Sequence, residues 1–252
     1  MFNHMKSFMK SLKEYITEGS LYEGLLDRVK NKEVNHDAIV KEFLEENYEI
    51  YGSYTIKTTN KGFVVDVKGD VEVTNKNITA LTNGLFEFGA VDESFKCNGC
   101  GSLTSLEGAP KEVGENFYCN YCGSLKTLEG APKEVGRSFS CSYCDSLRTL
   151  EGAPQKVKWS FNCNGCKSLT SLEGAPRECS DFNCQLCDSL TSLEGAPEKV
   201  KGDFYCSDCK SLKTLEGAPK EVKWDFLCNG CGMQFTKEDV KKYTKVVKNI
   251  YI

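Results

Sequence analysis

Apolar and polar positions repeat along this chain with a period of 22 residues. Each copy opens with phenylalanine and follows the pattern F-x-C-x-x-C-x-S-L-x-(S/T)-L-E-G-A-P, and the last copy is cut short. The spacing is 22 residues throughout, except for one interval of 21 between the fourth and fifth copies. A fixed period of this length is typical of a repeat array. The copies begin at Phe95, Phe117, Phe139, Phe161, Phe182, Phe204 and Phe226.

Within one copy, the pattern predicts a short coil that needs its neighbours. Phe95 and Cys97 alternate with polar residues, which predicts a short strand with one buried face. Gly108 permits a turn, and Pro110 prevents a helix from running through that point. A single coil cannot bury its own apolar positions, so the copies are predicted to stack into a solenoid. These positions are Phe95, Cys97, Cys100, Leu103, Leu106, Ala109, Pro110 and Val113.

The stretch F-K-C-N-G-C-G-S-L resembles the leucine-rich-repeat consensus L-x-x-L-x-L-x-x-(N/C)-x-L in its cysteine-containing variant. Phe95 and Cys97 match the strand positions, Cys100 matches the asparagine-or-cysteine position, and Leu103 matches the next apolar position. The likeness covers residues 95–231 and implies a solenoid of stacked strands. The leucine expected three residues before each Phe is absent, which leaves the curvature open. The S-L-T-S-L-E-G-A-P units are also similar to short-repeat proteins of large tailed bacteriophages.

The array is predicted to carry a cap at each end, because a solenoid must close its open ends. The fold class is therefore expected to be α+β: a short-coil, leucine-rich-repeat-like β solenoid with an N-terminal helical and hairpin cap and a C-terminal helix cap. The predicted segments are an N-terminal helical segment at 1–50, a hairpin and degenerate first coil at 51–94, the solenoid at 95–235 and the C-terminal cap at 236–252.

The N-terminal cap is predicted from helical spacing followed by alternation. Two or three short helices are expected before residue 50, one with an N-capping candidate at Asn35 or Asp37. Segments 54–58 and 63–67 indicate a hairpin. The positions expected to be apolar faces or buried slots here are Ile39, Val40, Phe43, Leu44, Val71, Val73, Ile78 and Leu81.

The C-terminal cap is predicted to be one helix. Thr236 and Asp239 have the spacing of a capping box. Val240, Tyr243 and Val247 are expected on one face of that helix.

Composition limits the expected partners and chemistry. The formal net charge is -4 with both signs mixed, so neither nucleic acid nor a membrane is expected as a partner. His4 and His36 have no nucleophile partner visible in the sequence, and no phosphate loop or paired-carboxylate motif occurs. The protein is therefore expected not to be an enzyme, and no catalytic residue is assigned. A cytoplasmic location is expected, in the host cell if the chain is phage-encoded, with the virion as the alternative.

The 15 cysteines raise the question of a metal. The recurring C-x2-C-x18-C-x2-C spacing matches a thiolate zinc site. Packing is favoured instead, because the Phe, both leucines and the Pro repeat as well, and because Cys179 occupies a slot that holds valine in other copies. Cys97 and Cys100, with their equivalents, are expected to form two interior columns at the strand spacing of about 4.8 Å. No cofactor or metal ligand is assigned, and zinc is the alternative.

Variable positions on a constant scaffold are the candidates for recognition. The residue after each Phe and the residue before each second Cys are predicted to point outward and differ between copies. Trp159 and Trp224 are expected near this face, with shielding of the coil edge as the alternative role. Exposed Tyr and Trp are frequent interface anchors. The candidate partner-binding residues are Tyr118, Tyr121, Tyr143, Trp159, Leu186, Tyr205 and Trp224.

A glutamate recurs at one position of each copy and is predicted to form a column of like charges. Compensation is expected either from lysines such as Lys111, Lys133 and Lys220 or from hydrogen bonds that the carboxylates accept from turn amides. The column comprises Glu107, Glu129, Glu151, Glu173, Glu194 and Glu216.

The sequence thus predicts a non-enzymatic repeat scaffold that binds a protein partner through its exposed strand face. Two alternatives stay open. The first is a virion-associated structural protein, because residues 5–18 resemble the N-terminal targeting peptides of internal head proteins in tailed phages, which are trimmed after triplets such as Ile16-Thr-Glu18. The second is a zinc-stabilised CxxC array.

Overall fold

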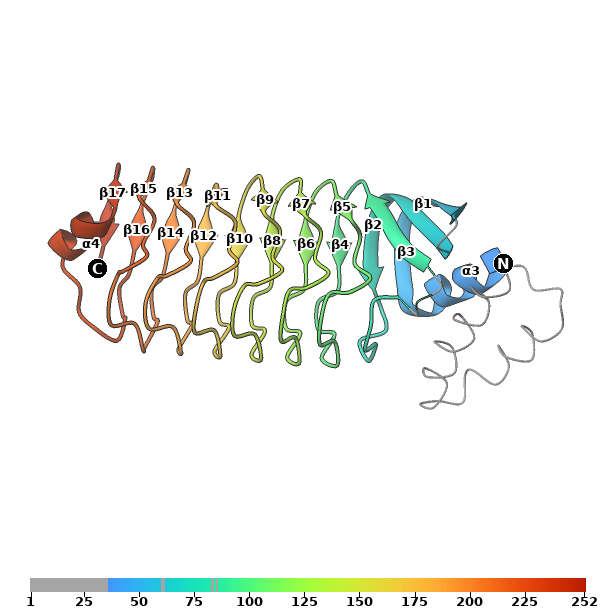
Figure 1. The fold of residues 1–252 in the computed structure, drawn as a ribbon, viewed down its shortest axis with the longest axis horizontal. Helices are drawn as coiled ribbons and strands as arrows, with labels where there is room; N and C mark the ends of the chain where they lie inside the picture. The colour runs from blue at the N-terminus through green and yellow to red at the C-terminus, as the bar shows by residue number, and fades with distance from the viewer. Residues whose placement is uncertain (1–35, 60–61, 83, 85) are drawn as a thin grey trace.

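The computed structural model describes residues 36–59, 62–82, 84 and 86–252, and it is a parallel β solenoid (Figure 1). Each coil contributes one two-residue strand to each of two ladders. The first ladder contains β4 (Phe95–Lys96), β6 (Phe117–Tyr118), β8 (Phe139–Ser140), β10 (Phe161–Asn162), β12 (Phe182–Asn183), β14 (Phe204–Tyr205), β16 (Phe226–Leu227) and β18 (Ile250–Tyr251). The solenoid of 22-residue coils predicted from the sequence is confirmed.

The second ladder was not predicted. It contains β5 (Glu112–Val113), β7 (Glu134–Val135), β9 (Lys156–Val157), β11 (Glu178–Cys179), β13 (Lys199–Val200), β15 (Glu221–Val222) and β17 (Lys245–Val246). In β5 to β15 the second residue, valine or Cys179, is buried and the residue before it lies on the outer side, whereas Val246 in β17 is partly buried. Pairing in this ladder is interrupted between β9 and β11. The interruption coincides with the 21-residue copy, in which the Ser180 amide donates to the Trp159 carbonyl at 2.7 Å.

The interior consists of columns of identical residues, as predicted. Each phenylalanine ring of the array stacks on the next, with centroids 5.1 to 5.6 Å apart. Cys97, Cys100, Leu103 and Leu106 are fully buried, and so are their equivalents in the following coils up to Leu212. Because every coil buries its apolar positions against its neighbours, the stack forms one continuous core.

The N-terminal cap joins both ladders through a long strand. Helix α3 (His36–Asn47) leads into β1 (Tyr48–Thr59), which pairs antiparallel with β2 (Gly62–Val73), and this hairpin confirms the predicted one. The parallel partners of β2 are β4 and β3 (Phe86–Val91), and β3 was not predicted. Residues 1–35, which include Asn35, the other expected helices and the targeting-peptide motif, lie outside the described residues.

The C-terminal cap contains α4 (Lys237–Tyr243), which begins at the predicted capping box: Thr236 Oγ1 accepts from the Asp239 amide at 3.1 Å. Val240 is buried, as an apolar face requires. The expectation that Val247 lies on this helix was wrong, because the chain leaves the helix at Thr244 in an extended conformation and enters β17. No helix among the described residues is both long enough and apolar enough to cross a bilayer.

Candidate partner-binding surface

The outer side of the first ladder is partly occupied by its own hydrogen bonds. Asn120 Oδ1 accepts from the Ser142 amide, and Asn98 Oδ1 accepts from the Asn120 amide, each at 2.9 Å. Polar side chains on this face therefore satisfy backbone donors of the next coil. The larger variable side chains are left as the groups that can contact a partner.

Tyr118 and Tyr205, which follow their phenylalanines, are half-buried on this face. The Tyr205 hydroxyl donates to Asp203 Oδ2 at 2.8 Å. Burial and the neighbouring Asp203 carboxylate raise the pKa of Tyr205 to about 12. This phenol is fixed and neutral at physiological pH.

The residue before each second cysteine lies in the turn that ends the strand, and not on the strand as predicted. All of these residues have left-handed backbone with φ between 58° and 72°: Gly99, Tyr121, Tyr143, Gly165, Leu186, Asp208 and Gly230. A side chain costs roughly 1–2 kcal/mol in this conformation, whereas glycine adopts it freely. The backbone is therefore strained where tyrosine or leucine occupies this turn, and the packing of the rest of the coil must offset the cost.

Two of the predicted residues form a stacked pair, which we call the tyrosine stack. The rings of Tyr121 and Tyr143 lie 4.9 Å apart between centroids with an interplanar angle of 1°. Tyr121 is 62% exposed. A β-carbon on Gly165 would lie 2.5 Å from the Tyr143 ring, so this ring covers the glycine of the following coil. The Tyr143 ring thus extends toward the next coil, and Gly165 of that coil covers the C-terminal end of the stack.

The predicted tryptophans form a separate group, two residues before their phenylalanines. Trp159 and Trp224 are 57% and 49% exposed, and each carries a cation over its ring. The Arg137 guanidinium lies 5.3 Å from the Trp159 ring centroid and Lys248 Nζ lies 4.3 Å from that of Trp224. Leu186 is 41% exposed. Apart from the tyrosine stack, no ring contact joins the candidate residues within the described part of the chain.

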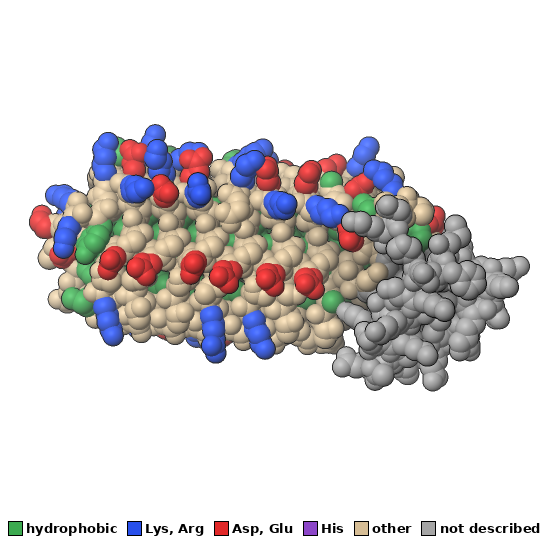
Figure 2. Space-filling view, viewed as in Figure 1, with side chains coloured by type: hydrophobic (Ala, Val, Ile, Leu, Met, Phe, Trp, Pro, Cys, Tyr) green, Lys and Arg blue, Asp and Glu red, His purple; other side chains and the backbone are tan. Residues whose placement is uncertain are grey.

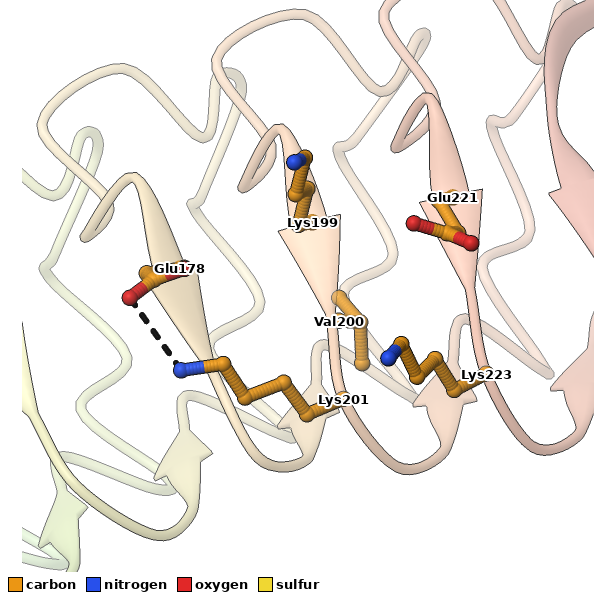
Figure 3. Close-up of a pocket in the computed structure, with 6 residues that line it drawn as sticks. All are labelled: Glu178, Lys199, Val200, Lys201, Glu221 and Lys223. Carbon is orange, nitrogen blue, oxygen red and sulfur yellow. Dashed lines mark hydrogen bonds and ion pairs between the residues drawn. The ribbon is translucent and has the colours of Figure 1, made fainter.

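The outer side of the second ladder is an array of charges. Figure 3 shows Lys201 reaching toward Glu178, at 3.1 Å, across a shallow hollow that is also lined by Lys199 and Lys223. Similar ion pairs join neighbouring coils, such as Lys156 with Glu134. The pairs are exposed and contribute little stability each. None of the candidate residues lies in this hollow.

The glutamate column is exposed, and neither expected form of compensation occurs among the described residues. Lys111 and Lys220 pair with Glu87 and Glu198 instead. The hydrogen bonds at these turns involve the glutamate amides, which donate to hydroxyls, as from Glu173 to Ser171 Oγ at 3.0 Å. Figure 2 shows a line of acidic side chains along the solenoid.

The second cysteine of every copy after the first has a role that sequence reasoning missed. Its thiol donates to the carbonyl of the first cysteine in the preceding coil, as from Cys122 Sγ to Cys97 O at 3.2 Å and from Cys144 Sγ to Cys119 O at 3.2 Å. The same contact recurs for Cys166, Cys187, Cys209 and Cys231. These thiols satisfy buried carbonyls just beyond the two-residue strands, where the first ladder ends.

Burial raises the pKa of the Cys119 and Cys179 thiols to about 12. Hydrogen bonds with thiols of the neighbouring coil, together with burial, raise the pKa of Cys97 and Cys141 well above its usual range. Zinc binds thiolates, and these four environments favour the protonated form. Hydrogen bonds with Cys184 and Cys206 instead lower the pKa of Cys209 and Cys228. The described residues contain no group of three or more His, Cys, Asp or Glu placed to hold a metal ion.

A strong chelator is expected to leave the melting temperature unchanged, because the cysteines are engaged in packing and in thiol-to-carbonyl hydrogen bonds. The measurement is a thermal melt in reducing buffer with and without the chelator, together with elemental analysis of the untreated protein. Stoichiometric zinc that is lost together with the melting transition would establish the zinc-stabilised array instead.

No protein-family model, curated protein or solved structure matches this chain.

Proposed function

We propose that the protein is a non-enzymatic repeat scaffold that binds a protein partner through exposed side chains beside its first ladder. The observation that carries the proposal is the left-handed turn occupied by Tyr121 and Tyr143, although glycine holds the same turn in other coils. Backbone strain persists where the surrounding structure enforces it and often marks functional positions. Here the strained turn holds the exposed Tyr121 ring and the half-buried Tyr143 ring at the surface, and aromatic rings are frequent binding anchors.

The arrangement suits binding better than chemistry. Polar groups of the strand face such as Asn98 and Asn120 are engaged with neighbouring coils. The exposed candidate side chains are aromatic rings and one leucine, and none of them is a nucleophile or a base of the usual catalytic types: Tyr121, Trp159, Leu186 and Trp224. The rigid stack holds these side chains at fixed spacing, so little conformational entropy is lost on binding. The tyrosine stack is the proposed centre, and the further contacts are Trp159, just before the strand of the next coil, and Leu186, two coils beyond Tyr143.

Alanine at Tyr121, Tyr143 and Trp159 together is expected to weaken partner binding at least tenfold while the melting temperature stays within about 2 °C. Exposed rings contribute to binding as anchors and bury little area in the free protein. The measurement is capture of partners by the wild type and the variant, followed by calorimetric titration of the purified partner. A fall in melting temperature with unchanged binding would make these residues structural.

Two matched variants sharpen this test. Met233→Ala removes an exposed apolar side chain, 51% accessible, near the C-terminal end of the array and is expected to leave binding unchanged. Tyr121→Gly relieves the left-handed strain and is expected to keep or raise stability by up to about 1 kcal/mol while binding falls. Loss of stability in Tyr121→Gly would contradict the assignment of strain to this position.

A further inference from the structure

The tyrosine stack is open at its N-terminal end. In the coil before Tyr121, the equivalent turn residue is Gly99, with the same left-handed backbone at φ 72°. A β-carbon on Gly99 would have no heavy atom within 4 Å among the described residues, and the same is true of Gly101 and Gly123. At the other end, the Tyr143 ring lies against Gly165. The stack thus has one closed end and one open end.

A third ring fits at the open end. Successive rings of this column are 4.9 Å apart, which is close to the strand spacing of about 4.8 Å, so the coils themselves set the stacking distance. A ring placed over Gly99 would meet the free face of Tyr121 at that same distance. Parallel, offset rings at this separation attract each other beyond the area that they bury. We call the space over Gly99 and beside the Tyr121 ring the open position.

The floor of the open position is rigid. The Gly99 amide donates to the Asn120 carbonyl at 2.8 Å, and the Gly99 carbonyl accepts from the Gly101 amide at 2.8 Å. Asn98 Oδ1 is engaged by the Asn120 amide. A ligand ring therefore meets a surface that is already ordered, which lowers the cost of binding.

The charges around this coil favour a neutral ring. Lys96, the cation on the strand of the same coil, is paired with Asp70 at 2.7 Å. A nucleotide would bring phosphate to a coil whose strand cation is already neutralised, in a protein of net charge -4. The aromatic side chains Phe, Tyr and Trp carry no such charge.

We propose that the open position binds an aromatic side chain, Phe, Tyr or Trp, that the protein partner supplies as the third ring of the stack. This inference rests on the proposed function and names the group that the partner contributes. An aromatic anchor paired with an aromatic anchor is a common centre of protein interfaces. Gly99 is then a recognition residue, because the absence of its side chain creates the position.

The decisive variant is Gly99→Tyr, which supplies the third ring from the protein itself. The backbone accepts it, because Tyr121 and Tyr143 already occupy this turn at φ 60° and 58°. The matched control is Gly230→Tyr, which adds the same side chain at φ 69° several coils away. There the Asp208 carboxylate must rotate aside, because its Oδ1 would lie 2.5 Å from the added β-carbon. Circular dichroism of both variants is expected to match the wild type.

The probe is N-acetyl-L-tryptophanamide, titrated into the full chain while the amide resonances of Gly99 and Gly101 are followed by NMR. Saturable shifts with a Kd on the order of 1–10 mM are expected for one stacked ring. Gly99→Tyr is expected to raise this Kd at least tenfold, and Gly230→Tyr is expected to leave it unchanged. Absence of saturable shifts in the wild type would overturn the inference.

Two further probes define the ligand class. N-acetyl-L-leucinamide is expected to give no saturable shift, and equal binding of leucine would overturn the inference by making the position merely apolar. Methyl β-D-glucoside is likewise expected not to bind, and its binding in place of tryptophan would overturn the aromatic assignment. A partner that binds Gly99→Tyr and wild type equally, but not the triple alanine variant, would remove this inference and leave the proposed function standing.

Discussion

Raising the pH from 7 to 10 in reducing buffer is expected to unfold the protein in one steep transition. Fourteen cysteines are buried and Cys231 is partly buried. Burial raises the pKa of Cys163, Cys179 and Cys206 above the ordinary thiol value. The folded chain thus keeps protons that the unfolded chain loses above its own thiol pKa of about 8.5.

Stability falls as the pH rises because protonation of the thiols is linked to folding. Below pH of about 8.5 both states are protonated, and the stability contributed by the protonated thiols is complete. Between that value and the folded pKa of about 12 for Cys119 and Cys179, each thiol ionises only in the unfolded state. Each ionisation therefore stabilises the unfolded state and lowers the free energy of unfolding. The loss is about 1.4 kcal/mol per thiol and pH unit. The pKa is raised for ten of the thiols, whereas hydrogen bonds with neighbouring thiols lower it for Cys209 and Cys228. The net loss at pH 10 is then on the order of 15–20 kcal/mol, which exceeds the usual 5–15 kcal/mol of a folded domain.

The measurement is far-ultraviolet circular dichroism against pH, with a phosphine reductant present, and the expected midpoint lies at about pH 9–10. The matched control is Cys179→Val, because valine fills this slot in the neighbouring coils at Val157 and Val200. This variant should have nearly wild-type stability at pH 7 and a slightly higher alkaline midpoint. Native dichroism that persists to pH 11 would show that the thiols do not control stability.

The interior of this solenoid was predictable from sequence because a 22-residue period fixes which residues stack. Phe95, Cys97 and Cys100 recur without change, so their burial in columns follows from the repeat alone. The zinc-like spacing is explained by the same geometry. One cysteine packs in the column and the other donates to a carbonyl of the preceding coil, as Cys122 does to Cys97.

Features that depend on two or three residues were not predictable in the same way. The second ladder has one buried side chain per coil, such as Val113 between an exposed glutamate and a glycine, and so gives no alternation to detect. The left-handed turn was hidden because Tyr121, Leu186 and Asp208 occupy it along with glycines. Glycine at three of its seven positions was the signal for positive φ, and it also marks where the tyrosine stack begins and ends.

The arrangement divides the chain into a constant interior and a few variable turns. Each coil is held by its neighbours, so a variable turn can carry a strained tyrosine while the columns of Phe, Cys and Leu supply the stability. The cost of such a residue is roughly 1–2 kcal/mol, which is small against the burial of one phenylalanine per coil. The proposed recognition residues therefore differ from the residues that supply stability, and variants can separate the two roles.

Phe161→Ala is expected to destabilise the protein by about 3–5 kcal/mol and to lower the melting temperature by about 10 °C. The Phe161 ring is fully buried between Phe139 and Phe182, with centroids 5.3 and 5.5 Å away. Its removal leaves a cavity with a stacking partner lost on each side, in a coil that also adjoins the interruption of the second ladder. Urea unfolding followed by circular dichroism measures the loss.

The damage should stay local at first, because each coil contacts only its neighbours. Hydrogen exchange is expected to show the largest loss of protection in the coils that begin at Phe139, Phe161 and Phe182. The paired strands β1 and β2 of the N-terminal cap are expected to keep their protection. Tyr121→Ala, at an exposed ring, is the control and should leave the melting temperature within about 2 °C. An equal loss of protection in every coil would contradict this nearest-neighbour behaviour and make the whole array a single cooperative unit.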